Sequence, residues 1–325
     1  MQPSNIRNEP RPQVCARIHR RALGDVRSKH NSLSMSSQKE NIPPNVEIST
    51  KVEICSPERL GDSSDPQDAY DFDLEVYSCL KHNEIVRQPA HSLFQNQSSI
   101  KPRMRAIVID WLVDVHKKLK LHTDTLFTAV DIIDLFLSAK DFDKHNLQRL
   151  GCAALLIASK SEEINAPDAD DFVFFSRNSF SIKDLHETEA EVMKALDFRV
   201  NPIHSSYFLK RFLRIADTTL EISMLAHFIN EMILLDNEMI GVCPSLRASA
   251  VLCLSLSLKK GGGQWTSELQ RNTGYSMNQL RPVISKILKA IHYAESAKLL
   301  AIVRKYSVDA VCRISETLFP DEFVY

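Results

Sequence analysis

Residues 147–164, LQRLGCAALLIASKSEEI, form the most uniformly apolar stretch of the chain. A helix over these residues has small or apolar side chains on nearly every side for about four turns, and a helix without a polar face is a buried one. The run is too short, and becomes charged too soon, to span a bilayer. We therefore expect other helices to surround it in an all-α domain.

The predicted helix 101–121 carries two apolar strips. One follows the i, i+3, i+4, i+7 pattern of a core-facing stripe, and the other lies on the opposite side of the helix. A single core cannot cover both, so part of this helix must face a second layer of its own chain or a partner. The first strip comprises Met104, Ile107, Val108, Trp111, Leu112, Val115 and Leu119, and the second comprises Ala106, Ile109 and Val113.

Four charged residues lie at predicted apolar faces. Arg105 borders the apolar arc of its helix and needs a carboxylate, for which Asp134 is the candidate unless that side chain is solvated. Glu189 interrupts the apolar stripe of the predicted helix 182–197, and Lys160 ends the central apolar helix. Lys160 and Glu189 could form an internal ion pair or anchor a partner helix, and the two interpretations are compatible.

The helical pattern restarts after residue 202. The runs echo the first five in order and length, and ALLIAS matches AVLCLS at an offset of roughly 96 residues. We expect two five-helix units in tandem, 69–200 and 201–312, and an irregular end, 313–325. The helical runs of the second unit are 205–216, 220–239, 245–259, 266–273 and 277–297.

Residues 1–68 are poor in aromatic residues and rich in Ser, Pro, Asn and Arg, so they cannot bury enough apolar area to fold. We expect a disordered tail with two linear motifs. Arg20 and Leu23, followed by Gly-Asp, resemble a destruction box, and Lys39-Glu40-Asn41 resembles a KEN box. Either motif alone also fits an ordinary solvated tail.

Composition excludes several classes of function. With 40 basic and 41 acidic residues, the chain has no excess positive charge for nucleic acid. Seven scattered cysteines suggest free thiols in a reducing compartment, and no segment is apolar for long enough to cross a membrane. His186 and Glu189 share a helix, but no nucleophile, metal-ligand spacing or phosphate loop accompanies them. We expect no enzyme, cofactor or metal, and a location in the nucleus and cytoplasm.

Three segments carry a family resemblance. Residues 104–115, MRAIVIDWLVDV, resemble the signature helix of a cyclin box; residues 158–164 and 196–198 resemble parts of its third and fifth helices. Phe208-Leu209-Lys210-Arg211 and the tail motifs are similar to B-type more than A-type mitotic cyclins. A cyclin-fold transcription factor is the alternative, but a zinc ribbon and a basic surface would be expected. Helical bundles without a partner would leave the charges and the second apolar strip unexplained.

The resemblance implies tandem cyclin-box folds and a non-catalytic subunit that activates a cyclin-dependent protein kinase at the G2/M transition. The anaphase-promoting ubiquitin ligase would recognise its tail. Arg105 and Asp134 would form an internal ion pair. A groove for Arg-x-Leu substrates or inhibitors would account for the second apolar strip, and Asp114 would receive the basic residue of the motif. The implied kinase-binding residues are Lys160, Glu162, Ile164, Glu189 and Phe198, and the implied groove residues are Met104, Ile107, Val108, Trp111, Asp114, Leu147 and Gln148.

Two positions depart from the family pattern. Ser161 stands where the family usually has an aromatic residue, which reduces the expected kinase contact. Lys144 replaces an arginine near the expected groove and removes a planar donor.

Overall fold

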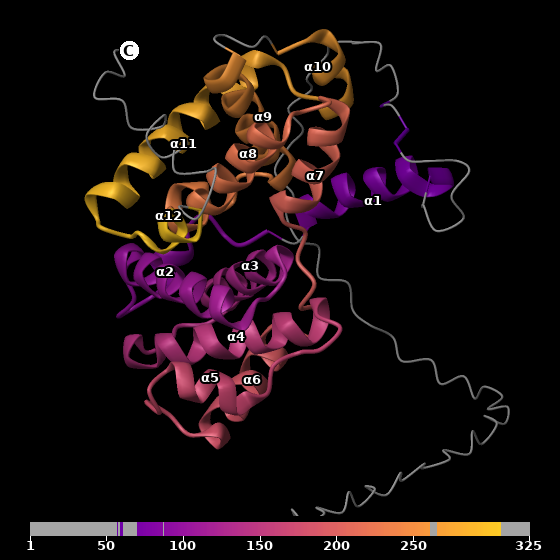
Figure 1. Cartoon of the computed structure of the whole chain (residues 1–325). Helices are drawn as coiled ribbons and strands as arrows, with labels where there is room; N and C mark the ends of the chain where they lie inside the picture. The colour runs from indigo at the N-terminus through magenta and orange to yellow at the C-terminus, as the bar shows by residue number, and fades with distance from the viewer. Residues whose placement is uncertain (1–56, 58, 61–69, 87, 261–264, 307–325) are drawn as a thin grey trace, which may run out of the picture. The chain divides into compact units, whose positions relative to one another are not determined.

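The computed structural model describes residues 57, 59–60, 70–86, 88–260 and 265–306. The two tail motifs and the expected irregular end lie outside these residues. Within them the chain is helical and contains no strand (Figure 1). The α-helices are α1 (Asp73–Val86), α2 (Pro102–Leu119), α3 (Thr123–Ala139), α4 (Leu147–Glu162), α5 (Ala169–Phe175), α6 (Ile182–Ala195), α7 (Ser205–Ile215), α8 (Leu220–Met232), α9 (Pro244–Lys260), α10 (Ser267–Thr273), α11 (Met277–Ser296) and α12 (Ala301–Tyr306).

The predicted all-α fold with tandem five-helix units is confirmed. Helices α2–α6 form the first unit and α7–α11 the second, while α1 and α12 flank them. The central apolar helix is α4, in which every residue from Leu150 to Ser159 is buried. It packs against the other four helices of its unit. In the second unit, α9 holds the corresponding place between α7, α8 and α11.

Helix α2 lies between two cores, and this corrects one expectation from the sequence. Ala106, Ile109 and Val113 are at most 1% exposed and belong to the core of the second unit, whereas Leu112 and Val115 belong to the core of the first. Figure 1 shows α2 and α3 between α4 and the second unit. The second apolar strip therefore covers another layer of the same chain and does not line a groove.

The predicted helix 220–239 is shorter in the structure. Helix α8 ends at Met232 and is followed by two 3-10 turns, η4 (Ile233–Leu235) and η5 (Asn237–Met239). Asp236 has extended backbone between them, and its carboxylate accepts a hydrogen bond from the N–H of Glu238 at 3.0 Å. Such a local side-chain bond competes with helical hydrogen bonding, so the helical run does not continue through Asp236.

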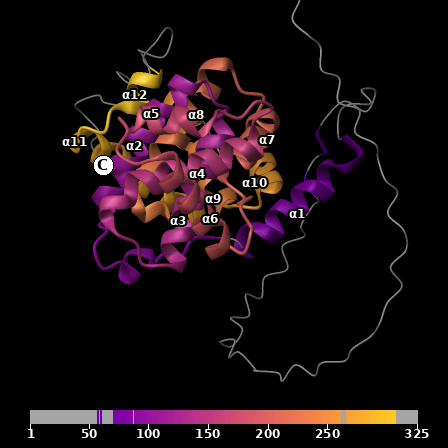
Figure 2. The ribbon, with the colours of Figure 1, turned by 90° about the horizontal axis from the view of Figure 1, so that it is seen from below.

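Helix α1 is fixed to the second unit by a buried carboxylate. Glu84 is 2% exposed and accepts from the backbone N–H and hydroxyl of Ser245 at 2.8 and 2.7 Å. Lys81 lies 3.2 Å from the same carboxylate and also donates to the hydroxyl of Tyr275. Figure 2 shows α1 at the edge of the other helices, extending outward from them. The segment before the first unit therefore folds onto the second.

Candidate functional site

Lys160 and Glu189 form an ion pair between α4 and α6. Lys160 Nζ lies 2.5 Å from Glu189 Oε1, and His186 Nδ1 lies 3.1 Å from Glu189 Oε2. Burial alone would raise the pKa of Glu189, but the hydrogen bonds from Lys160 and His186 hold it below its ordinary value. The Lys160 side chain remains 49% exposed. The pair is thus internal and also accessible from outside, as both sequence interpretations allowed.

Two apolar side chains among the implied kinase-binding residues are exposed. Ile164 is fully exposed and Phe198 is 66% exposed. Phe198 has a backbone φ of +58°, a conformation that is uncommon for a bulky residue and is often found at functional sites. We call Lys160, Glu189, Ile164 and Phe198 the anchor surface.

Glu162 and Ser161 are occupied by contacts within the chain. Glu162 accepts from Thr128 Oγ1 at 3.0 Å, and Tyr207 OH lies 3.4 Å from the same oxygen. Ser161 Oγ donates to Asn201 Oδ1 at 2.8 Å. Glu162 therefore connects the end of α4 to α3 and α7, in addition to any role toward a partner.

The implied groove residues form a half-exposed apolar surface between α2 and α4. Ile107 is 49% exposed, and Met104, Val108 and Trp111 are partly exposed. The amide of Gln148 is partly exposed and accepts a hydrogen bond from Ser179. Leu147 is buried in the core of the first unit and does not reach this surface. We call Met104, Ile107, Val108, Trp111 and Gln148 the α2–α4 surface.

Gly151 of α4, which was not among the residues predicted to matter, allows α2 to pack closely at this surface. A Cβ atom at Gly151 would lie 3.0 Å from Val108 Cγ1 and 3.2 Å from Leu112 Cδ1. The absence of a side chain lets α2 lie directly on α4. A glycine inside an otherwise apolar helix was the available signal, because it lowers helix stability and usually has a packing reason.

Asp114, expected to receive a basic residue from outside, is already paired within the chain. Arg304 Nη2 donates to Asp114 Oδ2 at 2.7 Å, and both side chains are partly exposed. Helix α12, which supplies Arg304, was not predicted. The available clue to α12 in the sequence was Glu231, a carboxylate inside the apolar pattern of α8. In the structure Glu231 is fully buried and accepts hydrogen bonds from Lys305 and Tyr306.

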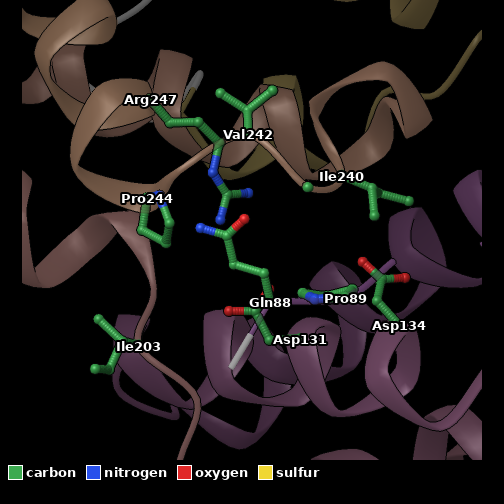
Figure 3. A pocket seen from close by; sticks show the side chains of 10 residues that line it. Gln88, Pro89, Asp131, Asp134, Ile203, Ile240, Val242, Pro244 and Arg247 are labelled. Carbon is green, nitrogen blue, oxygen red and sulfur yellow. The ribbon is translucent and has the colours of Figure 1, made fainter. Parts of the chain in front are cut away.

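A small polar cavity lies between the two units (Figure 3). Asp131 of α3 lines it, and burial raises the pKa of this carboxyl to about 7 although Arg247 across the cavity opposes the shift. The Arg247 side chain points toward Gln88 in Figure 3. Gln88 Nε2 and Arg247 Nε are buried and find no hydrogen-bond partner among the described residues.

Arg105 and Asp134 are also paired at this boundary. Arg105 Nε donates to Asp134 Oδ1 at 2.5 Å, and both side chains are buried. The ion pair expected from the sequence is therefore present, and a solvated Asp134 is excluded.

The described residues have three further features that concern thiols, membranes and metals. All four of their cysteines carry free thiols. None of their helices combines the length and the apolar character that crossing a bilayer requires. Their His, Cys, Asp and Glu side chains include no group of three or more placed to hold a metal ion.

Two family models match the chain in succession. The model described as cyclin, N-terminal domain, matches residues 75–201, and the model described as cyclin, C-terminal domain, matches residues 203–320.

Curated relatives of both B and A type are similar to the chain. It is 34% identical over 256 residues to the G2/mitotic-specific cyclin-B2 of Macaca fascicularis, covering 78% of this chain and 64% of the relative. It is 32% identical to the G2/mitotic-specific cyclin-B of Patella vulgata, covering 78% and 62%, and 34% identical to Cyclin-A1-2 of Arabidopsis thaliana, covering 76% and 57%. The chain thus spans a little under two thirds of the length of these relatives.

Solved structures share the fold at low sequence identity. A viral cyclin from herpesvirus saimiri superposes with a TM-score of 0.62 at 19% identity, covering 67% of this chain and 97% of that one. A chain of the yeast RNA Pol II CTD kinase CTDK-1 complex superposes with a TM-score of 0.55 at 15% identity, covering 75% and 84%.

Proposed function

Because this chain belongs to the cyclin family, we propose that it is a non-catalytic subunit that binds and activates a cyclin-dependent protein kinase. The observation that carries the proposal is the anchor surface. An ion pair there offers hydrogen-bonding groups to a partner, and exposed Ile164 and Phe198 flank it in sequence with apolar area. Exposed apolar side chains near accessible charges are typical of a protein interface.

Activation would follow from a difference in binding energy. A partner shifts a kinase toward its active state only if it binds that state more tightly than the inactive one. We propose that the anchor surface holds the regulatory C-helix of the kinase in its inward position. That position completes the Lys–Glu ion pair of the kinase active site and orders the activation loop.

The test is reconstitution from purified components. The full chain is mixed with a cyclin-dependent kinase subunit, and complex formation and peptide phosphorylation are both measured. We expect a stable complex and phosphorylation well above that of the kinase alone. Absence of a complex at micromolar concentrations with each mitotic cyclin-dependent kinase tested would contradict the proposal.

We further propose a B-type role at the G2/M transition. The support is the segment Phe208-Leu209-Lys210-Arg211, which is similar to B-type cyclins. An A-type-like cyclin is the second candidate, since A-type relatives match at comparable identity. Depletion distinguishes the two: a B-type role predicts arrest at entry into mitosis, and an A-type-like role predicts defects already in S phase.

Removal of the protein through its tail is a separate proposal. Arg20 and Leu23, with Lys39-Glu40-Asn41, would recruit the anaphase-promoting ubiquitin ligase. The half-life is measured after release from mitotic arrest, with alanine at Arg20 and Leu23, at residues 39–41, or at all five positions. We expect the fivefold variant to persist while wild type disappears, and equal half-lives would contradict this. Imaging a tagged chain tests the proposed location in nucleus and cytoplasm.

The α2–α4 surface is proposed to dock Arg-x-Leu substrates or inhibitors. Exposed Ile107 and the partly exposed Met104 and Trp111 would contact the leucine. Docking at a site separate from the anchor surface would raise the effective concentration of substrate near the kinase.

A further inference from the structure

We propose that Arg304 is a specificity-determining residue of the α2–α4 surface, because it occupies Asp114 and makes a peptide's basic residue compete with the chain's own cation. This inference rests on the proposed docking function of that surface. Arg304 would decide how much of a peptide's affinity comes from its basic residue and how much from its apolar residues.

Asp114 is well placed to serve both the surface and Arg304. Residues three and four apart on a helix are neighbours, so Asp114 lies beside Trp111 on one side and Asp110 on the other. Trp111 belongs to the α2–α4 surface, whereas Asp110 accepts from the backbone N–H of Ala301 in α12 at 2.9 Å. Asp114 thus lies at the border between the exposed apolar area and the C-terminal helix.

Helix α12 holds Arg304 in position through contacts that do not involve Asp114. Lys305 Nζ donates to both carboxylate oxygens of fully buried Glu231, at 2.6 and 2.8 Å. Tyr306 OH donates to the same carboxylate at 2.8 Å. Lys117 Nζ donates to the carbonyl of Arg304 at 3.1 Å. The backbone that carries Arg304 is therefore held beside α2, while the side chain itself is 55% exposed.

A basic residue on a bound peptide would then gain little. It would meet a carboxylate whose charge Arg304 already neutralises, so the two cations compete for Asp114 and the peptide gains less than it would from an unpaired carboxylate. We expect the wild-type surface to select peptides mainly by their apolar residues, through contact with Ile107 and Trp111. Removal of the Arg304 charge would give the peptide's basic residue a carboxylate of its own.

The experiment measures the affinity of the full chain for two fluorescently labelled peptides that differ only at one position, Arg-x-Leu and Ala-x-Leu. The variants are Arg304→Met, which keeps the aliphatic stem, and Arg304→Ala. The control is Arg281→Ala, which removes the same charge from an exposed position of α11. Anisotropy titrations give the dissociation constants, and circular dichroism checks that each variant folds.

We expect both Arg304 variants to bind the Arg-x-Leu peptide about two- to fivefold more tightly than wild type, the range of an exposed ion pair. Affinity for Ala-x-Leu and the behaviour of Arg281→Ala should stay within error of wild type. In an Asp114→Asn background, Arg304→Met should bring no gain. Salt near 1 M should abolish the gain, because exposed charges are then screened.

Two results overturn the inference and are distinguishable. If wild type binds Arg-x-Leu and the folded Arg304 variants bind it equally or more weakly, the inference fails while the docking function stands. If no variant binds either peptide, the proposed docking function fails and the inference fails with it.

Discussion

Arg105 of α2 makes a bidentate ion pair with Asp134 of α3, with Nε···Oδ1 and Nη2···Oδ2 distances of 2.5 and 2.6 Å. Both side chains are about 2% exposed. The remaining Nη1 group donates to the carbonyl of Leu234 in η4 at 2.9 Å. One guanidinium therefore joins two helices of the first unit to the second unit.

Replacing Arg105 with alanine should destabilise the chain strongly. The change leaves a buried carboxylate without a cation and the Leu234 carbonyl without this donor, and breaking a buried pair in this way costs about 3–5 kcal/mol. Chemical denaturation measures the free energy of unfolding. An Arg105→Met/Asp134→Leu double variant should lose less than Arg105→Ala, because neither partner remains charged. A loss below about 1 kcal/mol in Arg105→Ala would contradict this role.

Asp131 should make stability depend on pH. Its pKa is about 7 in the folded chain and about 3.9 when unfolded, so the folded chain binds the proton more tightly. The contribution of Asp131 to the free energy of unfolding is fully present below about pH 4 and is lost as the pH rises through about 7. Burial lowers the pKa values of His204 and His116 to about 3 and about 4. These two groups therefore lower the free energy of unfolding as the pH falls below about 6.5, which is opposite to the effect of Asp131.

Comparison with Asp131→Asn isolates this group, because the histidines are common to both proteins. The free energy of unfolding of the variant minus that of wild type should increase from pH 5 to pH 8. The upper bound of the increase is about 2.7 kcal/mol, because about two pH units of this range lie below the folded pKa of about 7 and each is worth about 1.36 kcal/mol. Urea denaturation at each pH gives the difference. A difference that stays constant across this range would show that Asp131 does not titrate as described.

Lys305 should matter for stability although it lies near the end of the described chain. Its ammonium and the Tyr306 hydroxyl are donors to Glu231, which is fully buried. We expect Lys305→Met to lose about 2–4 kcal/mol, since one partner of a buried pair is removed. Lys298→Met, at an exposed position just before α12, is the matched control and should remain within about 0.5 kcal/mol of wild type. Equal unfolding midpoints for the two variants would refute the anchoring role of Glu231.

The sequence was sufficient for the fold because helical periodicity is a local signal. The apolar run of α4 and the second strip of α2 indicated burial correctly, whereas the first strip is buried only at Leu112 and Val115 and leaves Ile107 49% exposed. The partner of each strip depends on tertiary packing that a single chain pattern does not contain. The pattern therefore left open a second layer of the chain or a partner for Ala106 and its neighbours; the second layer is present, and the groove that was to account for this strip was wrong. Residue types alone also identified Arg105 with Asp134 and Lys160 with Glu189, since a charge at an apolar face requires a partner.

Contacts between distant segments were not predictable in the same way. Asp114 and Arg304 are separated by 190 residues. Each is an ordinary polar residue on its own helix, so the sequence around one does not predict that the other is its partner. Helix α12 has only six residues, fewer than the periodicity of an amphipathic helix needs to become visible.

The central claim is that the anchor surface binds the kinase. The direct measurement is the affinity of a cyclin-dependent kinase for wild type and for Lys160→Ala/Glu189→Ala, together with phosphorylation by each complex. The matched control is Lys183→Ala/Glu187→Ala, which removes another Lys–Glu pair from α6, 3.8 Å apart and exposed. Circular dichroism confirms folding of both.

We predict that the Lys160/Glu189 variant loses at least tenfold in affinity and most of the kinase activation, while the Lys183/Glu187 control matches wild type. A folded Lys160/Glu189 variant that binds and activates the kinase as well as wild type would contradict the account.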